Sequence, residues 1–179
     1  MARNQHRSAP CSPRDRAGPT AYAASVALEL RELTESEVVE FAWGSFQAYL
    51  GERVKSGETT AAVTADSEGQ FEAMFPDGKA RPGHLLWRLE ERAEPVGTLW
   101  IGPVSPEDAL TYWVWDIVIT DAHRGRGLGR QAMQLAEEQA RVAGATTLGL
   151  TVFAHNPVAW RLYEQLGYEP ISTRMSKTL

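Results

Sequence analysis

The chain has almost no cysteine, and this scarcity limits the chemistry open to it. Its 179 residues include one cysteine, Cys11, so no intrachain disulfide can form and no zinc site can rest on cysteine pairs. We therefore expect no metal centre of that kind and a reducing, cytoplasmic location.

The sequence also lacks an excess of basic residues and a long apolar run. Its net charge of -5 at pH 7 argues against a nucleic-acid surface, which needs a dominant basic stripe. No apolar run approaches the roughly 20 residues that cross a bilayer, and the N-terminus has no apolar core of a secretory signal. We expect neither nucleic-acid nor membrane partners, while an amine substrate is compatible with the acidic charge.

The first 22 residues differ in composition from the rest. They are rich in Arg, Ser and Pro, with almost no large apolar side chain, so they cannot bury enough surface to offset the entropy of ordering. We predict a disordered tail over residues 1–22 and a single globular domain over residues 23–179. The content of 43% hydrophobic and 23% charged residues is typical of such a domain.

The N-terminal half of the domain indicates a strand followed by helices. Residues 26–33 alternate as a strand, and Thr34 with Glu37 forms a capping box before a helix. A weaker helical stretch over residues 59–75 is interrupted near Gly69. Three strand-like runs then predict an antiparallel meander. They span residues 84–91, 95–101 and 110–120.

The C-terminal half alternates helices and strands. A helix begins after Gly127 and ends near Gly144, and a strand over residues 146–153 follows it. A helix over residues 157–166 and a last strand from residue 168 toward residue 177 complete the chain. This order predicts an α/β fold of the mixed α+β kind, with a mixed sheet covered by helices.

A loop rich in glycine and arginine connects the apolar strand before residue 120 to the following helix. The first N–H groups of a helix have no internal partner and carry partial positive charge, so anions bind there. Glycines let phosphate oxygens approach these amides, and arginines add forked donors. The glycines are Gly125, Gly127 and Gly129, and the arginines are Arg124, Arg126 and Arg130. We expect this loop to bind a diphosphate.

Other phosphate-binding loops fit the sequence poorly. A Walker A loop needs Lys and then Ser or Thr where the chain has Arg130 and Gln131. A Rossmann fingerprint needs glycine at position 130 and an acidic residue near Val152. RGG-type RNA segments are long and disordered, whereas this loop adjoins an amphipathic helix. A turn that merely starts a helix explains one glycine, not three.

A second group of residues follows on the helix over residues 157–166. At about 100° per residue, Asn156, Ala159 and Tyr163 share one side of this helix. On their own they also fit an ordinary N-cap asparagine and a half-buried tyrosine.

Together the two segments resemble the GCN5-related N-acetyltransferase (GNAT) superfamily. The cofactor motif R/Q-x-x-G-x-G/A is matched by Arg124 to Gly129, and N-x-x-A-x-x-x-Y-x-x-x-G-F/Y by Asn156 to Tyr168. The resemblance extends from residues 26–33 through Gly97-Thr98-Leu99 to Met175. It implies a mostly antiparallel sheet of about six to seven strands, about four flanking helices and a splayed strand pair at the cofactor site.

The resemblance also implies direct transfer of an acetyl group from acetyl-CoA to a primary amine of a small molecule or peptide. Tyr163 then matches the group that donates a proton to sulfur. Because its reference pKa of about 10 exceeds the thiol value of about 8.5, full transfer is uphill by roughly 2 kcal/mol, and a hydrogen bond to the thiolate does most of the work. The implied cofactor-binding residues are Ile117, Val118, Ile119, Arg124, Gly125, Arg126, Gly127, Leu128, Gly129, Arg130, Asn156, Ala159 and Tyr163.

Asp116 is the candidate general base. It is the one acidic residue in its apolar strand and directly precedes the cofactor segment, where burial raises a carboxyl pKa toward useful basicity. A strand-edge aspartate that only accepts hydrogen bonds is the alternative. His123 and His155 flank the motifs, but a histidine beside a loop is more often a surface polar residue.

Aromatic residues offer a wall for the acceptor amine. Trp43 and Phe46 lie on the early helix where the family places this wall, and Trp113 and Trp115 neighbour Asp116. Aromatic rings hold cations or planar groups, yet they also fill cores. Two rival functions remain open: a transferase for protein N-termini or lysines, and a non-catalytic acyl-CoA sensor. Either a monomer or a homodimer is compatible with the sequence.

Overall fold

The computed structural model describes residues 27–65, 67–175 and 177. The tail predicted over residues 1–22 lies outside the described residues. Within the described part, one sheet holds five strands in the order β1-β2-β3-β4-β5. Neighbouring strands from β1 to β4 are antiparallel, and β4 and β5 are parallel. The strands are β1 (Glu29–Glu32), β2 (Leu85–Glu91), β3 (Glu94–Ser105), β4 (Asp108–Ile119) and β5 (Thr147–Leu150).

The mixed, mostly antiparallel sheet is confirmed, but the expected count of six to seven strands is wrong for the described residues. The last strand, predicted from residue 168 toward residue 177, does not form there. Ile171 and Met175 are 89% and 90% exposed. Tyr168 still packs against the larger core, but the described residues after it have no neighbouring strand to fix a register.

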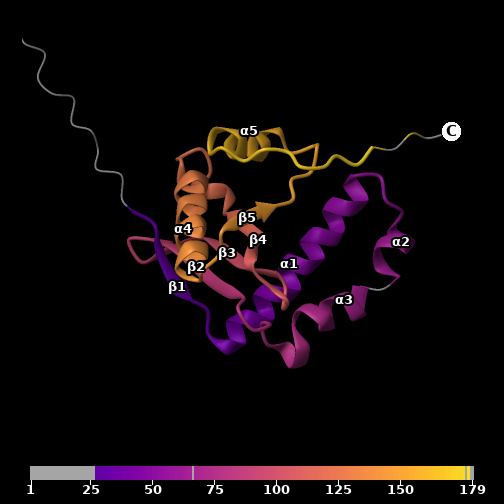
Figure 1. Ribbon diagram of the computed structural model, residues 1–179, viewed down its shortest axis with the longest axis horizontal. Helices are drawn as coiled ribbons and strands as arrows, with labels where there is room; N and C mark the ends of the chain where they lie inside the picture. The colour runs from indigo at the N-terminus through magenta and orange to yellow at the C-terminus, as the bar shows by residue number, and fades with distance from the viewer. Residues whose placement is uncertain (1–26, 66, 176, 178–179) are drawn as a thin grey trace, which may run out of the picture.

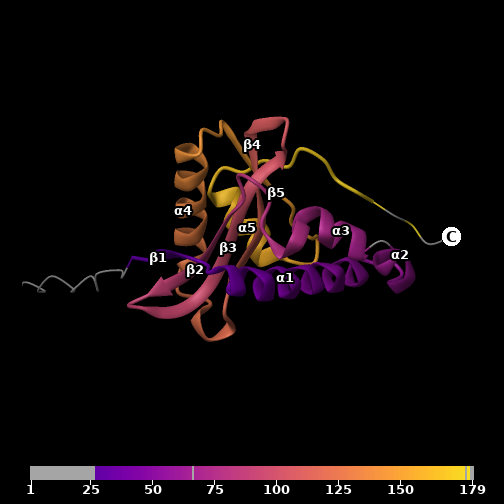
Figure 2. The same cartoon turned by 90° about the horizontal axis from the view of Figure 1, so that it is seen from below.

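Helices lie on both sides of the sheet (Figure 1). Viewed from below, α4 lies on one side of the strands and α1 with α3 on the other (Figure 2). The described residues form five α-helices, compared with about four predicted. They are α1 (Glu35–Lys55), α2 (Thr60–Thr64), α3 (Ser67–Met74), α4 (Leu128–Val142) and α5 (Pro157–Gln165), with short 3-10 turns at Pro76–Gly78 and Asp121–His123.

The break predicted near Gly69 lies elsewhere. Helix α2 ends at Thr64, and Gly69 is inside α3. One glycine costs a helix only about 1 kcal/mol relative to alanine. Packing of Phe71 and Met74 against the cluster around Phe46 offsets that cost, which is a long-range effect that local sequence does not reveal.

The sheet separates two apolar cores because successive strand residues face opposite sides. Leu99 and Ile101 pack with Met133 of α4 in the larger core, whereas Trp100 between them packs with Phe75 on the α1 side. All of these side chains are at most 2% exposed. None of the helices in residues 27–65, 67–175 and 177 is long and apolar enough to cross a membrane.

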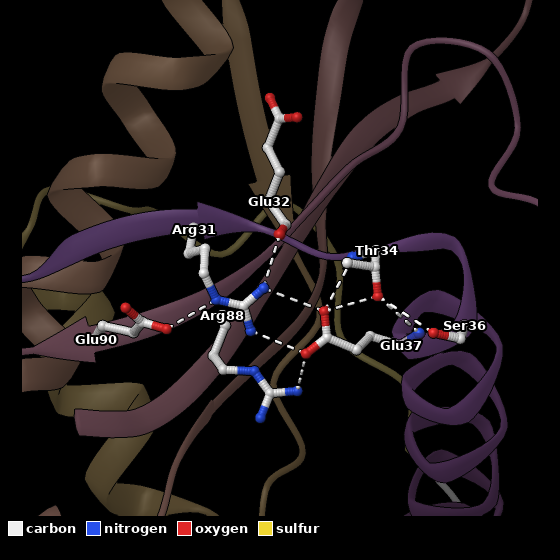
Figure 3. A network of polar contacts seen from close by, with 7 residues as sticks. All are labelled: Arg31, Glu32, Thr34, Ser36, Glu37, Arg88 and Glu90. Atoms are coloured by element: carbon white, nitrogen blue, oxygen red, sulfur yellow. Dashed lines mark hydrogen bonds and ion pairs between the residues drawn. The ribbon is translucent and has the colours of Figure 1, made fainter. Parts of the chain in front are cut away.

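The start of α1 is fixed by the predicted capping box and by a network of charges (Figure 3). The Thr34 side chain accepts from the Glu37 N–H, and the Glu37 carboxylate accepts from the Thr34 N–H. Glu37 also lies 2.9 Å from Arg31 of β1 and 3.0 Å from Arg88 of β2. Hydrogen bonds, first of all from Arg31, hold the pKa of Glu37 well below its usual range. The network joins α1 to two strands.

Candidate active site

A bulge in β4 shapes the centre of the site. Trp100 and Ile101 are consecutive in β3, but they pair with Asp116 and Val114 of β4, so Trp115 is an extra residue. Such a bulge bends a strand and redirects its side chains. Trp115 packs at the edge of the α1-side core, and the Asp116 carboxylate reaches the Ser45 hydroxyl of α1.

Beyond the bulge, β4 has no β5 partner. The parallel pairing covers Thr111 to Val114 of β4 and ends at Leu150 of β5, whereas β4 continues to Ile119. This arrangement gives the expected splayed pair. It leaves the β5-facing backbone groups of residues 117–119 outside the ladder, where a ligand can pair with them.

Asp116 is a partly buried carboxylate with an altered pKa. Burial raises the pKa of Asp116 to about 6, while hydrogen bonds from the Ser45 hydroxyl and the Ile117 N–H limit the rise. A raised pKa is the direction expected for a single acidic residue in an apolar strand. At pH 7 to 8 the Asp116 carboxylate is ionised and can accept a proton. Its pKa of about 6 makes it a stronger base than an ordinary carboxylate, as a general base requires.

Tyr163 of α5 lies within electrostatic reach of Asp116. Burial raises the pKa of Tyr163, and the negative charge of Asp116 raises it further. Its ring also meets Tyr168 edge-on at 6.0 Å between centroids. At neutral pH the hydroxyl therefore keeps its proton and remains a hydrogen-bond donor. Strand β4 and helix α5 thus bring the two predicted catalytic groups together across 47 positions of sequence.

Helix α4 begins directly after Gly127 of the glycine-rich loop, as the sequence predicts. Gly125 and Gly127 have φ angles of 75° and 81°, in the left-handed region, and Gly127 is the N-cap of α4. A Cβ at either position would meet no atom within 4 Å, so the space in front of them is open. Gly129 differs, because its Cβ would lie 3.4 Å from Leu162 of α5. At this third glycine the start of α4 lies within van der Waals range of the Leu162 side chain of α5.

Each loop arginine has a protein partner in the structure. Arg124 donates to the Ile119 carbonyl at 3.1 Å and pairs with Asp121 at 2.9 Å, in an exposed ion pair of the kind that stabilises little. Arg126 pairs with Glu91 at the end of β2, at 2.6 Å.

Arg130 donates to the side chain of Gln165 at 2.5 Å and so joins α4 to α5. The three arginines were expected to bind phosphate, and the positions of these protein partners depend on the fold rather than on the local sequence. Their assignment to the cofactor stays a prediction.

The Asn156 side chain caps α5. Its oxygen accepts a hydrogen bond from the Ala159 N–H at 3.1 Å, with Pro157 in the first turn. The N-cap interpretation of Asn156 is therefore confirmed, and Tyr163 is partly buried as expected. A contact of Asn156 or Ala159 with the cofactor stays a prediction.

The four aromatic candidates do not form one wall. Trp43 is 50% exposed on α1, whereas Phe46 is 4% exposed and belongs to the core. Trp113 packs over Gly149 of β5, where an added Cβ would lie 2.3 Å from its ring. Trp115 stacks on Trp100 and His84 and donates to the Gly102 carbonyl.

Several residues at the site escaped the sequence analysis. Ser45 is the main omission. Its position on a partly buried face of the helix, one turn before Tyr49, is the signal in the sequence that could have indicated it. His84 is another, a buried histidine whose Nδ1 accepts from Trp100 at 3.0 Å. Burial lowers the pKa of His84 to about 4. His155, set aside as a surface residue, pairs with Glu52 of α1 at 2.5 Å.

Three features define an acyltransferase-like class of site. They are the splayed β4–β5 pair, the open glycine loop at the start of a helix, and the carboxylate within electrostatic reach of a tyrosine. The model described as "Acetyltransferase (GNAT) family" matches residues 38–168. This chain therefore belongs to the GNAT acetyltransferase family, and it is an acyltransferase.

Individual relatives agree with this assignment. The N-acetyltransferase YdgE of Bacillus subtilis is 34% identical over 158 residues, which cover 86% of this chain and 99% of YdgE. The crystal structure of the acetyltransferase YycN from Bacillus subtilis has a TM-score of 0.76 at 30% identity, covering 86% of this chain and 99% of that chain. The L-2,4-diaminobutyric acid acetyltransferase of Streptomyces coelicolor is 30% identical over 62% of this chain and 68% of its own length.

Proposed function

We propose that this protein is an acetyl-CoA-dependent N-acetyltransferase that acts on a primary amine of a small molecule or peptide. The observation that carries the proposal is the partly buried Asp116 carboxylate, with its raised pKa, within electrostatic reach of a protonated Tyr163 where β4 and β5 separate. The name of the diaminobutyric acid acetyltransferase includes a small amine, which supports an acceptor of that class.

The glycine loop is compatible with the diphosphate of coenzyme A. The open space in front of Gly125 and Gly127 would admit phosphate oxygens, and the first N–H groups of α4 would bind them. Arg124 would leave its exposed ion pair with Asp121 at little cost. The residues proposed to hold acetyl-CoA are Ile117, Val118, Ile119, Arg124, Gly125, Arg126, Gly127, Leu128, Gly129, Arg130, Asn156, Ala159 and Tyr163.

Acetyl-CoA would supply the acetyl group as a thioester, whose C–S bond breaks as the bond from the carbonyl carbon to the amine nitrogen forms. Asp116 would accept the proton that the amine loses. A free alkylammonium has a pKa near 10.4, so its prior deprotonation by a group of pKa about 6 is uphill by roughly 6 kcal/mol. The amine would therefore enter in its neutral form, which alone has the lone pair that attacks the carbonyl carbon, and Asp116 would accept the N–H proton as the new bond forms and the nitrogen becomes acidic.

Tyr163 would act on the sulfur as a hydrogen-bond donor. Since the pKa of Tyr163 is raised above its ordinary value, full proton transfer is costlier than the roughly 2 kcal/mol given by reference values. The neutral hydroxyl stabilises negative charge on the departing sulfur without giving up its proton.

Release of free thiol from acetyl-CoA tests the proposal. The full chain would be incubated with acetyl-CoA and a panel of primary amines, with the one thiol of the chain, Cys11, subtracted as one equivalent. We expect amine-dependent release that Asp116→Asn reduces by about 100-fold or more. Acetyl-CoA binding without release on every amine would favour the sensor function instead.

A further inference from the structure

Three aromatic rings meet beside the bulge in β4. They belong to His84, Trp100 and Trp115, which come from the residue before β2, from β3 and from β4. The distances between the ring centroids are 5.7 Å, 5.6 Å and 5.7 Å, so each ring contacts both of the others. We call these three rings the ring triangle.

Hydrogen bonds and a glycine hold the ring triangle together. Trp100 Nε1 donates to His84 Nδ1 at 3.0 Å, and Trp115 Nε1 donates to the Gly102 carbonyl at 3.2 Å. The His84 ring lies directly against Gly102, where an added Cβ would come within 2.6 Å of His84 Cγ. His84 and Trp100 are 8% and 2% exposed. These buried contacts fix the place of the Trp115 ring.

The place of Trp115 decides the direction in which Asp116 points. Side chains alternate between the two faces of a sheet, so a shift of one residue in the pairing turns each side chain to the opposite face. Trp100, on the α1 side, pairs with Asp116 because the bulge leaves Trp115 as an extra residue. Without the bulge, Trp115 would lie opposite Trp100. Asp116 would then lie opposite Leu99 and face the larger apolar core on the α4 side.

Side-chain contacts must favour the bulge over the regular register, because a bulge interrupts the ladder of backbone hydrogen bonds. The ring triangle supplies such contacts. The Trp115 indole reaches back along β4 to Gly102, which pairs with Trp113, so this ring leans away from Asp116. We propose that His84 is a positioning residue for the transfer reaction: its ring holds Trp115, keeps the bulge and thereby keeps Asp116 on the α1 side. This inference rests on the proposed transferase function.

The contact with Gly102 requires a flat side chain at position 84. A phenylalanine ring has the same flat shape and can contact both tryptophans, although it offers no acceptor to the Trp100 N–H. Alanine leaves the space of the ring empty, and the branched leucine side chain is too thick for the close approach over Gly102. Variants at this one position therefore separate the ring from the rest of the histidine.

Thiol release by the full chain, with acetyl-CoA and an amine that the wild-type protein acetylates, tests the inference. We expect kcat at least about tenfold lower for His84→Ala and His84→Leu, with KM for acetyl-CoA within about twofold of wild type. His84→Phe should restore kcat to within about threefold of wild type. Equal kcat values for wild type and the two variants that lack a ring would overturn the inference and leave the transferase standing.

Val63→Ala is the matched control for a general loss of stability. Val63 is 1% exposed and belongs to the cluster around Phe46, on the same side of the sheet as the ring triangle but separate from it. We expect Val63→Ala to lower the urea midpoint while kcat stays within about twofold of wild type. A loss of kcat equal to that of His84→Ala would overturn a specific role for His84.

Carboxyl carbon NMR measures the placement of Asp116 without turnover. Burial raises the pKa of Asp116 to about 6, and its resonance would be assigned as the one that Asp116→Asn removes. We expect the titration midpoint to move by at least about 0.5 pH unit in His84→Ala and His84→Leu, and to stay within about 0.2 in His84→Phe. Identical midpoints in all variants would overturn the inference. No release by the wild-type protein would overturn the transferase, while midpoints that move as expected would still support the placement of Asp116 by His84.

Discussion

Replacement of Asp116 by asparagine should stabilise the protein while it removes activity. Burial raises the pKa of Asp116 from 3.8 to about 6, so the folded protein binds this proton more tightly than the unfolded chain does. Above about pH 6 both states are ionised, and the folded state carries the full cost of the buried charge. The folded and unfolded pKa values of Asp116 differ by about 2.2, so the charge lowers the free energy of unfolding by roughly 3 kcal/mol.

The cost should depend on pH in a defined direction. As pH falls from about 6 to 3.8, the folded state takes up the proton first, so the cost of the charge fades. At pH 5 about half of it remains, or roughly 1.6 kcal/mol. Asparagine keeps the shape and can still accept from Ser45, so Asp116→Asn should gain about 1–3 kcal/mol at pH 8 and about half as much at pH 5.

Urea unfolding at both pH values measures these gains, and thiol release measures activity. Asp77→Asn is the matched control: Asp77 is exposed and has a φ of 53°, a conformation that asparagine tolerates well. An Asp116→Asn protein that is less stable than wild type at pH 8, or whose gain is the same at both pH values, would refute the reasoning. Activity within twofold of wild type would remove Asp116 as the base.

Three other variants test separate parts of the structure. Gly97→Ala should lose at least about 2 kcal/mol in urea unfolding, since its Cβ would lie 2.1 Å from the Val118 carbonyl oxygen; an unchanged midpoint would contradict the β3–β4 approach. Burial lowers the pKa of His84 to about 4, so the unfolded chain binds a proton at this residue more tightly than the folded protein does. As the pH falls from 7.5 to 5, His84 should therefore lower the free energy of unfolding by roughly 2 kcal/mol. His84→Phe should remove that pH dependence. An unaltered slope of the free energy of unfolding against pH would exclude His84 as its source. Tyr163→Phe should lower turnover about 10- to 100-fold with acetyl-CoA affinity nearly intact, as turnover and calorimetric titration would measure; unchanged turnover removes Tyr163 from the mechanism.

Local signals in the sequence predicted the starts of three helices well. The capping box at Thr34, the left-handed Gly127 and the N-cap at Asn156 each depend on atoms within about four residues along the chain. The bulge-and-splay arrangement around Asp116 followed from the family resemblance. The residue types that carry these features are visible without knowledge of the fold.

The acceptor side depends on contacts between distant residues. Glu52 and His155 are 103 positions apart, and neither has a sequence neighbour that indicates the other. The same holds for Ser45 and Asp116. The missing last strand has a related cause, because a strand forms only where a neighbour offers its backbone and a core receives its side chains.

Helix α1 links the charge network at its start to Ser45 near its middle, whose hydroxyl donates to the Asp116 carboxylate. Glu37 is held by Arg31 and Arg88, and Ser45 follows about 12 Å farther along the axis. A tilt of α1 by about 5° at Glu37 would move Ser45 by about 1 Å, and a displacement of that size can cost about 100-fold in rate. A tilt of α1 would therefore move the Ser45 hydroxyl relative to the Asp116 carboxylate, while the loop that starts α4 would be unaffected.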